Sequence, residues 1–117
     1  MALAPLLQKI FKSKVFFIIT MLSKSPVDLD KVNEEDIDKE ILRWGIMAEL
    51  DAINFYEQMA EKAKDPYVKK VMLEVAKEEK EHVGEFQSML FDKDKEQVEE
   101  YEEGKKEVEE MKSESSE

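Results

Sequence analysis

Hydrophobic side chains recur at helical spacing along two long stretches of the chain. In each stretch, apolar or small residues return every three or four positions, which is typical of one face of an amphipathic helix. The first stripe passes through Leu42, Gly45, Ile46, Glu49, Ala52, Ile53, Tyr56 and Ala60. The second stripe passes through Val68, Val71, Met72, Val75, Ala76, Glu79, His82, Val83, Phe86 and Leu90. The pattern predicts two helices that pack through these faces.

Helix-start and helix-stop signals bound the two stretches. Asn33 is a good N-cap and is followed by three acidic residues, so it predicts the start of the first helix. Asp65 predicts the next cap, with Pro66 at the first helical position. The second helix is expected to run to about Phe91, before the charged cluster at 92–95. Residues 33–91 therefore predict an antiparallel helical hairpin.

The acidic segment 92–117 forms a separate part of the chain. Its 26 residues hold twelve acidic residues and five lysines, and so carry −7 of the net charge of −11. A thin apolar seam at near-heptad spacing, interrupted by Lys105, consists of Val98, Tyr101, Val108 and Met111. It predicts either a weaker third helix or a solvated, partly frayed acidic helix. Residues 113–117 are expected to be disordered.

Residues 1–32 are expected to be an N-terminal extension. Lysines precede an apolar run from Val15 to Leu22, which is shorter than the ~20 residues of a transmembrane helix. No small-residue cleavage pattern precedes Ser23, which argues against a secretory signal. Two interpretations of residues 1–20 stay open. They form an extra packed helix, or they lie upstream of a true start at Met21.

Composition narrows the fold and the partners. The chain has 117 residues, the size of one small domain, and only three Gly and three Pro, which favours an all-α fold. A net charge of −11 opposes binding to nucleic-acid phosphates, and we expect no membrane association. The absence of cysteine excludes thiolate metal sites on this chain. Any metal must be held by oxygen and nitrogen ligands.

Three ionisable residues lie within the apolar stripes: Glu49, Glu79 and His82. An unpaired buried carboxylate is costly, so it must be protonated, paired or metal-bound. Glu49 precedes Asp65 by 16 residues and Glu79 follows it by 14, so a hairpin places the two carboxylates side by side. His82 lies one turn after Glu79 on the same helix face. The spacing predicts that all three converge.

This set is half of a dinuclear carboxylate site. Such four-helix sites use four carboxylates and two Glu-x-x-His histidines, and a two-fold dimer of this chain would supply them. Iron or manganese suits such ligands better than copper does. The alternative is a metal-free buried polar cluster. Tyr56 is either core or a hydrogen-bond donor behind the ligands, and Asp51, off the stripe, is expected to be solvated.

The segments Ala48 to Tyr56 (AELDAINFY) and Glu78 to His82 (EEKEH) resemble the encapsulated ferritins and the ferritin-like segment fused to some archaeal encapsulins. The resemblance implies a hairpin that dimerises into a ferritin-like four-helix bundle and assembles into a larger ring. It places metal ligands at Glu49, Glu79 and His82. The family's acidic metal-uptake pair would fall on Ala48 and Asp51, so only half is present. A shell-docking peptide is not recognised at the C-terminal residues, which fits a shell-fused type, a fragment or a protein without it.

The resemblance implies a ferroxidase that oxidises Fe(II) to Fe(III) at a site holding two irons per dimer. The iron would be stored inside an encapsulin shell in the cytoplasm. Two other functions are open on the residues alone. One is a rubrerythrin-like peroxide reductase, which would need an external electron donor because this chain has no cysteine. The other is a metal-free helical adaptor.

Overall fold

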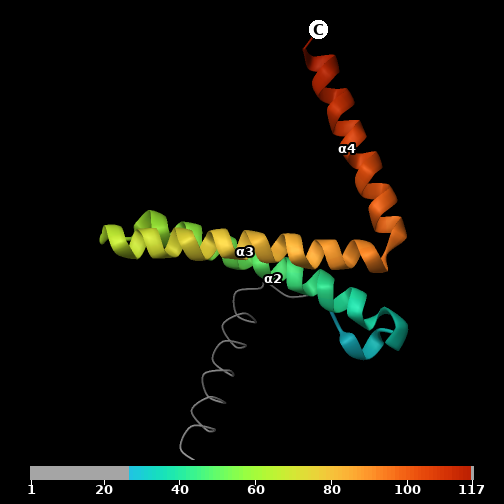
Figure 1. Cartoon of the computed structure of the whole chain (residues 1–117), viewed down its shortest axis with the longest axis horizontal. Coiled ribbons are helices and arrows are strands. Elements are labelled where there is room, and N and C mark those ends of the chain that lie inside the picture. Colours follow the sequence, from blue (N-terminus) through green and yellow to red (C-terminus); the bar gives the residue numbers. More distant parts are fainter. Residues whose placement is uncertain (1–26, 117) are drawn as a thin grey trace, which may run out of the picture.

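The computed structural model describes residues 27–116, and the part described is helical without any strand. Two short 3-10 turns, η1 (Leu29–Lys31) and η2 (Glu34–Asp36), lead into α2 (Ile37–Lys62). The chain then turns back into α3 (Pro66–Lys93), which lies along α2, and α4 (Lys95–Ser115) leaves the far end of α3 at a steep angle (Figure 1). The all-α class and the antiparallel hairpin are thus confirmed. The expectations for residues 1–20 lie outside the described residues.

The first long helix starts later than predicted. Asn33 caps only the short η2, and its side chain makes no capping hydrogen bond. The amide of Asp36 donates to the carbonyl of Asn33 at 2.9 Å, so the first turn closes with 3-10 hydrogen bonding. The α-helical pattern begins at Ile37. The prediction of a helix start at Asn33 is therefore wrong by one turn.

The hairpin turn matches the prediction from Asp65 and Pro66. One carboxylate oxygen of Asp65 accepts hydrogen bonds from the amides of Tyr67 at 2.7 Å and Val68 at 3.4 Å. Pro66 occupies the first turn of α3, where its missing N–H leaves no intrahelical hydrogen bond unmade. Local chemistry alone thus ends one helix and starts the next.

The core between α2 and α3 is thin. Among the described residues no polar or charged residue is buried. In the described part of the chain five hydrophobic residues are buried: Leu42, Ile53, Ala60, Ala76 and Leu90. The helices lie close together at Gly45, where an added Cβ would lie 3.1 Å from the ring of Phe86. Val68 and Val71 of the predicted stripe are 45% and 57% exposed, because the apolar face of α3 is wider than α2 covers. These hydrophobic side chains therefore lie outside the core between α2 and α3.

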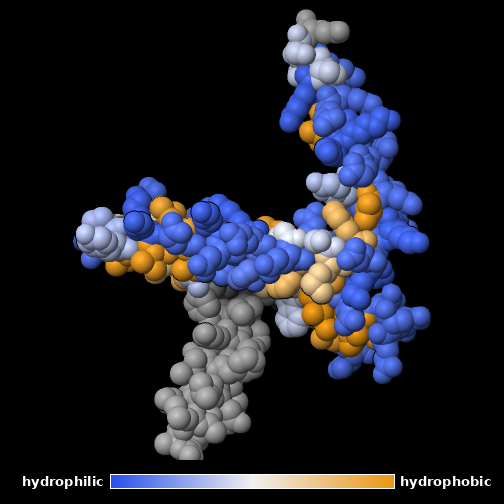
Figure 2. Space-filling view, viewed as in Figure 1, coloured by the Kyte–Doolittle hydropathy of each residue, from blue (hydrophilic) through white to orange (hydrophobic). Residues whose placement is uncertain are grey.

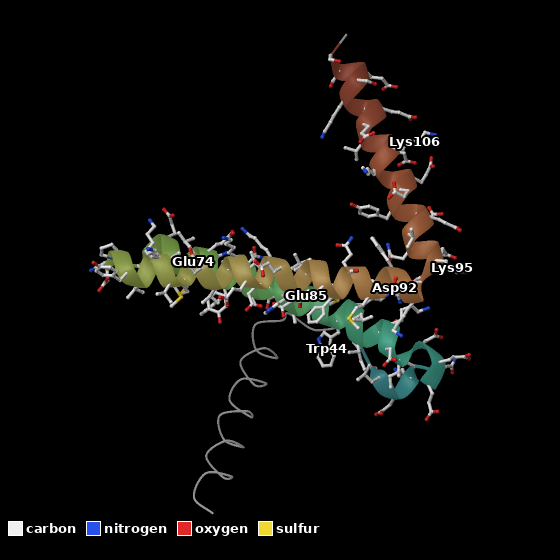
Figure 3. The ribbon with its side chains drawn as sticks, in the orientation of Figure 1. Trp44, Glu74, Glu85, Asp92, Lys95 and Lys106 are labelled. Atoms are coloured by element: carbon white, nitrogen blue, oxygen red, sulfur yellow. The ribbon has the colours of Figure 1, made fainter. Side chains whose placement is uncertain are left out.

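The acidic segment is a regular helix. α4 continues to Ser115, so the expectation of disorder from Ser113 onward is wrong as far as Ser115. Asp94 starts it: one carboxylate oxygen accepts from the amide of Gln97 at 3.1 Å. The other oxygen accepts from the guanidinium of Arg43 on α2 at 2.9 Å. The hinge region, marked by Asp92 and Lys95 in Figure 3, is therefore tied to the hairpin.

Asp94 is the described residue with a clear electrostatic perturbation. The hydrogen bond from the Gln97 amide lowers the pKa of the Asp94 carboxyl, and the nearby charges of Lys39 and Arg43 add to this against an opposing effect of burial. Arg43 also donates to Glu40 at 2.8 Å, so one guanidinium bridges two carboxylates. The start of α4 is consequently held by an ionised Asp94.

None of the helices described is long and apolar enough to traverse a bilayer.

Candidate metal centre

Three side chains converge between the two hairpin helices. Glu49 comes from α2, and Glu79 and His82 come from α3. The Nδ1 atom of His82 lies 3.5 Å from Oε2 of Glu49 and 3.4 Å from Oε2 of Glu79. One potential ligand atom from each residue lies within 4.8 Å of the other two. The predicted convergence of these residues is therefore observed.

The local backbone explains this convergence. Glu79 and His82 are three residues apart on α3, so they lie one above the other on a single helix face. Glu49 reaches them because the turn at Asp65 brings the middle of α2 beside the middle of α3. The close approach of Gly45 to Phe86, one turn before Glu49, keeps the two helix axes near each other at this level. Helix register and hairpin register together build the cluster.

The arrangement is close to that of a ligand set. Around an ion with bonds of ~2.1 Å, neighbouring ligand atoms lie about 3 Å apart and opposite ones about 4.2 Å apart. The two nitrogen-to-oxygen distances of 3.4 and 3.5 Å and the limit of 4.8 Å need only small side-chain adjustments to reach those values. Two carboxylates and one imidazole are donors that suit iron or manganese.

One oxygen atom of the cluster is buried without a hydrogen-bond partner among the described residues. The side chains of Glu49 and Glu79 are only 17% and 18% exposed, whereas that of His82 is 43% exposed. Oε2 of Glu49 is buried and accepts no hydrogen bond from any described residue. Because a buried carboxylate oxygen needs a proton, a donor or a cation, this atom marks a place that a metal ion would satisfy.

Tyr56 does not join the three. Its ring packs edge-on against that of Phe55, with ring centres 5.3 Å apart. Within the described part of the chain its phenol makes no hydrogen bond to the cluster. The structure thus favours packing for Tyr56 in a single chain.

Asp51 is less solvated than the sequence predicted. Its Oδ2 atom is buried without a hydrogen-bond partner among the described residues, and the same holds for Nε1 of Trp44 on the same helix. Trp44 extends from α2 on the side away from α3 (Figure 3). The two residues are seven positions apart, and Phe55 continues the row, so a heptad count on α2 would have revealed this second face. The prediction that Asp51 is simply solvated is wrong for Oδ2.

Comparison with known proteins places this geometry in context. Residues 40–116 match the family model described as rubrerythrin, a range that includes all three converging residues. A curated protein of Pyrococcus furiosus named ferritin-like-encapsulin shell fusion protein is 50% identical over 93 residues, covering 78% of this chain and 27% of the relative. The chain thus spans about a quarter of that relative's length.

The fold also has a counterpart among solved structures. The crystal structure of the encapsulated ferritin domain from Pyrococcus furiosus matches with a TM-score of 0.65 and 50% sequence identity. The match covers 76% of this chain and 93% of the solved chain. Sequence and fold therefore indicate the same relatives.

Proposed function

Because this chain belongs to the rubrerythrin family of ferritin-like proteins, and within it to the encapsulated ferritins, we propose that it is a ferroxidase. It oxidises Fe(II) to Fe(III) at a dinuclear site, and iron is its substrate. The observation that carries the proposal is the convergence of Glu49, Glu79 and His82, with one carboxylate oxygen buried and unpartnered.

The proposed site is completed by a second copy of the chain. One chain offers two carboxylates and one imidazole, and a two-fold related copy doubles this to the set that a dinuclear carboxylate site needs. The face of α3 that carries His82 also carries Val75 and Met89, each seven residues away. Met89 is 51% exposed and Val71, on the same side, is 57% exposed. A second hairpin on this face would bury these residues together with His82.

The ligands have distinct roles in this proposal. The anionic oxygens of Glu49 and Glu79 attract Fe(II) and bind the higher charge of Fe(III) more strongly, which favours oxidation. His82 binds through a neutral ring nitrogen, so acid would release the metal. Two Fe(II) ions at the dinuclear site give up one electron each, and the oxidant takes up both. O2 with two protons becomes H2O2, or H2O2 with two protons becomes two water molecules. Asp51 is proposed to assist metal uptake, and Tyr56 to support the ligands from behind once the second chain is present.

The proposed setting is an encapsulin compartment. The relative that is 50% identical is named as a fusion of a ferritin-like part with an encapsulin shell. A dimer of hairpins encloses no storage cavity, so oxidised iron would be stored in the volume that a shell provides. The net charge of −11 would raise the local Fe(II) concentration around the protein. We propose that dimers assemble further into a ring inside that shell.

Rapid mixing of the protein with Fe(II) under air tests the proposal, with Fe(III) formation followed by absorbance. Substituting any one ligand by Ala removes two ligands from each dimer, so the rate is expected to fall well beyond tenfold, since changes behind the ligands already cost about 10- to 100-fold. The matched control is Glu81→Ala, which removes an exposed carboxylate two residues from Glu79. An unchanged rate in Glu79→Ala would refute the site.

Oxidant and metal use separate this function from its rivals. Consumption of O2 and of H2O2 after anaerobic Fe(II) loading distinguishes a ferroxidase from a rubrerythrin-like peroxide reductase, which would turn over peroxide repeatedly with an external reductant. Metal analysis of the purified protein tests the adaptor alternative, which predicts no bound iron.

Sedimentation tests whether the metal site is shared between two chains. Chelator-treated protein should associate when Fe(II) is added, because metal binding and dimerisation are linked.

A further inference from the structure

α4 carries a heptad pattern that the proposed ferroxidase function does not use. Counting sevens along the helix places Tyr101 and Val108 at one seam position and Gly104 and Met111 at the other, which are the a and d positions of a coiled coil. Tyr101, Val108 and Met111 are 45%, 49% and 65% exposed. The ring of Tyr101 also packs against that of Phe91 at the end of α3, with ring centres 5.3 Å apart. Beyond Tyr101 the seam lies open along a helix that points away from the hairpin (Figure 1).

Charges flank this seam in an ordered way. On one side, at the g positions, stand three glutamates seven residues apart: Glu100, Glu107 and Glu114. On the other side, at the e positions, stand Val98, Lys105 and Lys112. The visible surface of α4 is mostly hydrophilic, with small hydrophobic areas along the helix (Figure 2). Acidic residues are frequent along the whole segment, but of the two positions that flank the seam, g is always glutamate and e carries two lysines.

We propose that α4 pairs with α4 of a second copy as a short parallel coiled coil. In a parallel pair each g residue faces the e residue five positions later on the partner helix. Glu100 then faces Lys105, and Glu107 faces Lys112, in both directions across the pair. In an antiparallel pair g faces g and e faces e, so glutamates would oppose glutamates and lysines would oppose lysines. The charges thus select one orientation.

The lysines of α4 also decide which residues form the seam. Shifting the seam to Val98 and Tyr101 would put Lys105 and Lys112 at core positions, where burying two ammonium groups is unfavourable. In the proposed register the small Gly104 lets the two helices approach, and an added Cβ there would meet nothing within 4 Å in the single chain. The pairing uses no metal ligand, so it is independent of the proposed ferroxidase site.

Cysteine trapping tests the proposed pairing directly. The chain has no cysteine, so each single-cysteine variant of the full chain reports one contact. Val108→Cys lies in the seam and should form a disulfide-linked dimer under mild oxidation, with or without chelator. Lys106→Cys, at an outer position midway along α4 (Figure 3), should be trapped about tenfold less. Equal yields from the two variants would overturn the proposal, and so would failure of Val108→Cys to be trapped.

Charge reversal gives a second test within the Val108→Cys background. Glu100→Lys with Glu107→Lys makes both flanks basic, and Lys105→Glu with Lys112→Glu makes both flanks acidic. Each reversed protein alone should be trapped about tenfold less than the parent, whereas mixing the two should restore the yield as a heterodimer. Restoration cannot arise from misfolded variants. Unchanged trapping of the reversed proteins, or a mixture that stays low, would overturn the pairing.

Discussion

Replacing Glu49 by Gln isolates the electrostatics of the cluster. The change keeps the length of the side chain and removes the charge from a carboxylate whose Oε2 is buried without a hydrogen-bond partner. The carboxylate of Glu79 is close by, with ligand oxygens no more than 4.8 Å apart. The metal-free variant should therefore be more stable than the wild type.

The distance sets the size of the effect. At 4.8 Å, the largest separation of the two ligand oxygens, two unit charges repel by about 1 kcal/mol in a water-like medium and by about 3.5 kcal/mol at an effective dielectric constant of 20. The two side chains are 17% and 18% exposed, so the repulsion should lie between these limits. Part of the gain is offset because the new amide must find partners for its N–H groups. We expect a net rise of about 1 kcal/mol in the free energy of unfolding.

Urea denaturation followed by circular dichroism measures this, at one fixed protein concentration because association contributes to stability. Anaerobic Fe(II) should reverse the order of stability. A metal present at 100 times its dissociation constant adds about 2.7 kcal/mol to the wild type, whereas the variant gains much less because it has lost a charged ligand. The control is Glu61→Gln on the exposed side of α2, which should change stability by less than about 0.5 kcal/mol.

Two results would refute this reasoning. A metal-free Glu49→Gln protein that is less stable than the wild type would mean that the carboxylate is already satisfied. Equal stabilisation of both proteins by Fe(II) would mean that Glu49 does not bind the metal.

Three further predictions concern the scaffold. A backbone amide in the first turn of α4 lowers the pKa of Asp94, so the stability that this carboxylate contributes is full above about pH 4 and is lost as the pH falls through the lower folded pKa. Protection of the amides at the start of α4 against hydrogen exchange should therefore decrease at that low pH, and Asp94→Asn should remove this pH dependence. Gly84→Ala should raise the free energy of unfolding in urea by about 0.5–1 kcal/mol, because nothing lies within 4 Å of the new Cβ. Gly45→Ala should raise it less or lower it, because the new Cβ would lie 3.1 Å from a phenylalanine ring. Asp65→Ala should lower the free energy of unfolding by about 1 kcal/mol through loss of the cap, while Asn33→Ala, whose side chain caps nothing, should leave it nearly unchanged.

The hairpin was predictable because its signals are local. Asp65 and Pro66 end one helix and start another through their own hydrogen bonding, so the turn needs no distant contact. The start of α2 was not predictable to the residue, because a 3-10 turn and an α-turn after Asn33 differ by one hydrogen-bond step. The regularity and length of α4 were underestimated for a different reason. Its beginning is held by Arg43, which lies 51 residues before Asp94, and such a contact is invisible in the local pattern. At its end, the hydroxyls of Ser113 and Ser115 donate to the carbonyls three residues earlier, at 2.8 and 3.0 Å, within the helix.

The cluster was predictable because polar residues within an apolar stripe are conspicuous. Glu49, Glu79 and His82 stood out against their neighbours, and the hairpin register placed them at one level. The buried atoms of Trp44 and Asp51 were missed because they lie on a face of α2 that the hairpin does not cover. Only a second heptad count would have separated them from the exposed residues.

Anomalous diffraction at the iron absorption edge, from crystals loaded with Fe(II) without oxygen, would locate the metal directly. The proposed site predicts two iron peaks beside a two-fold axis, within bonding distance of Glu49, Glu79 and His82 from both chains. A single peak held by the residues of one chain, or iron bound elsewhere with the cluster empty, would contradict a ferroxidase site shared between two copies.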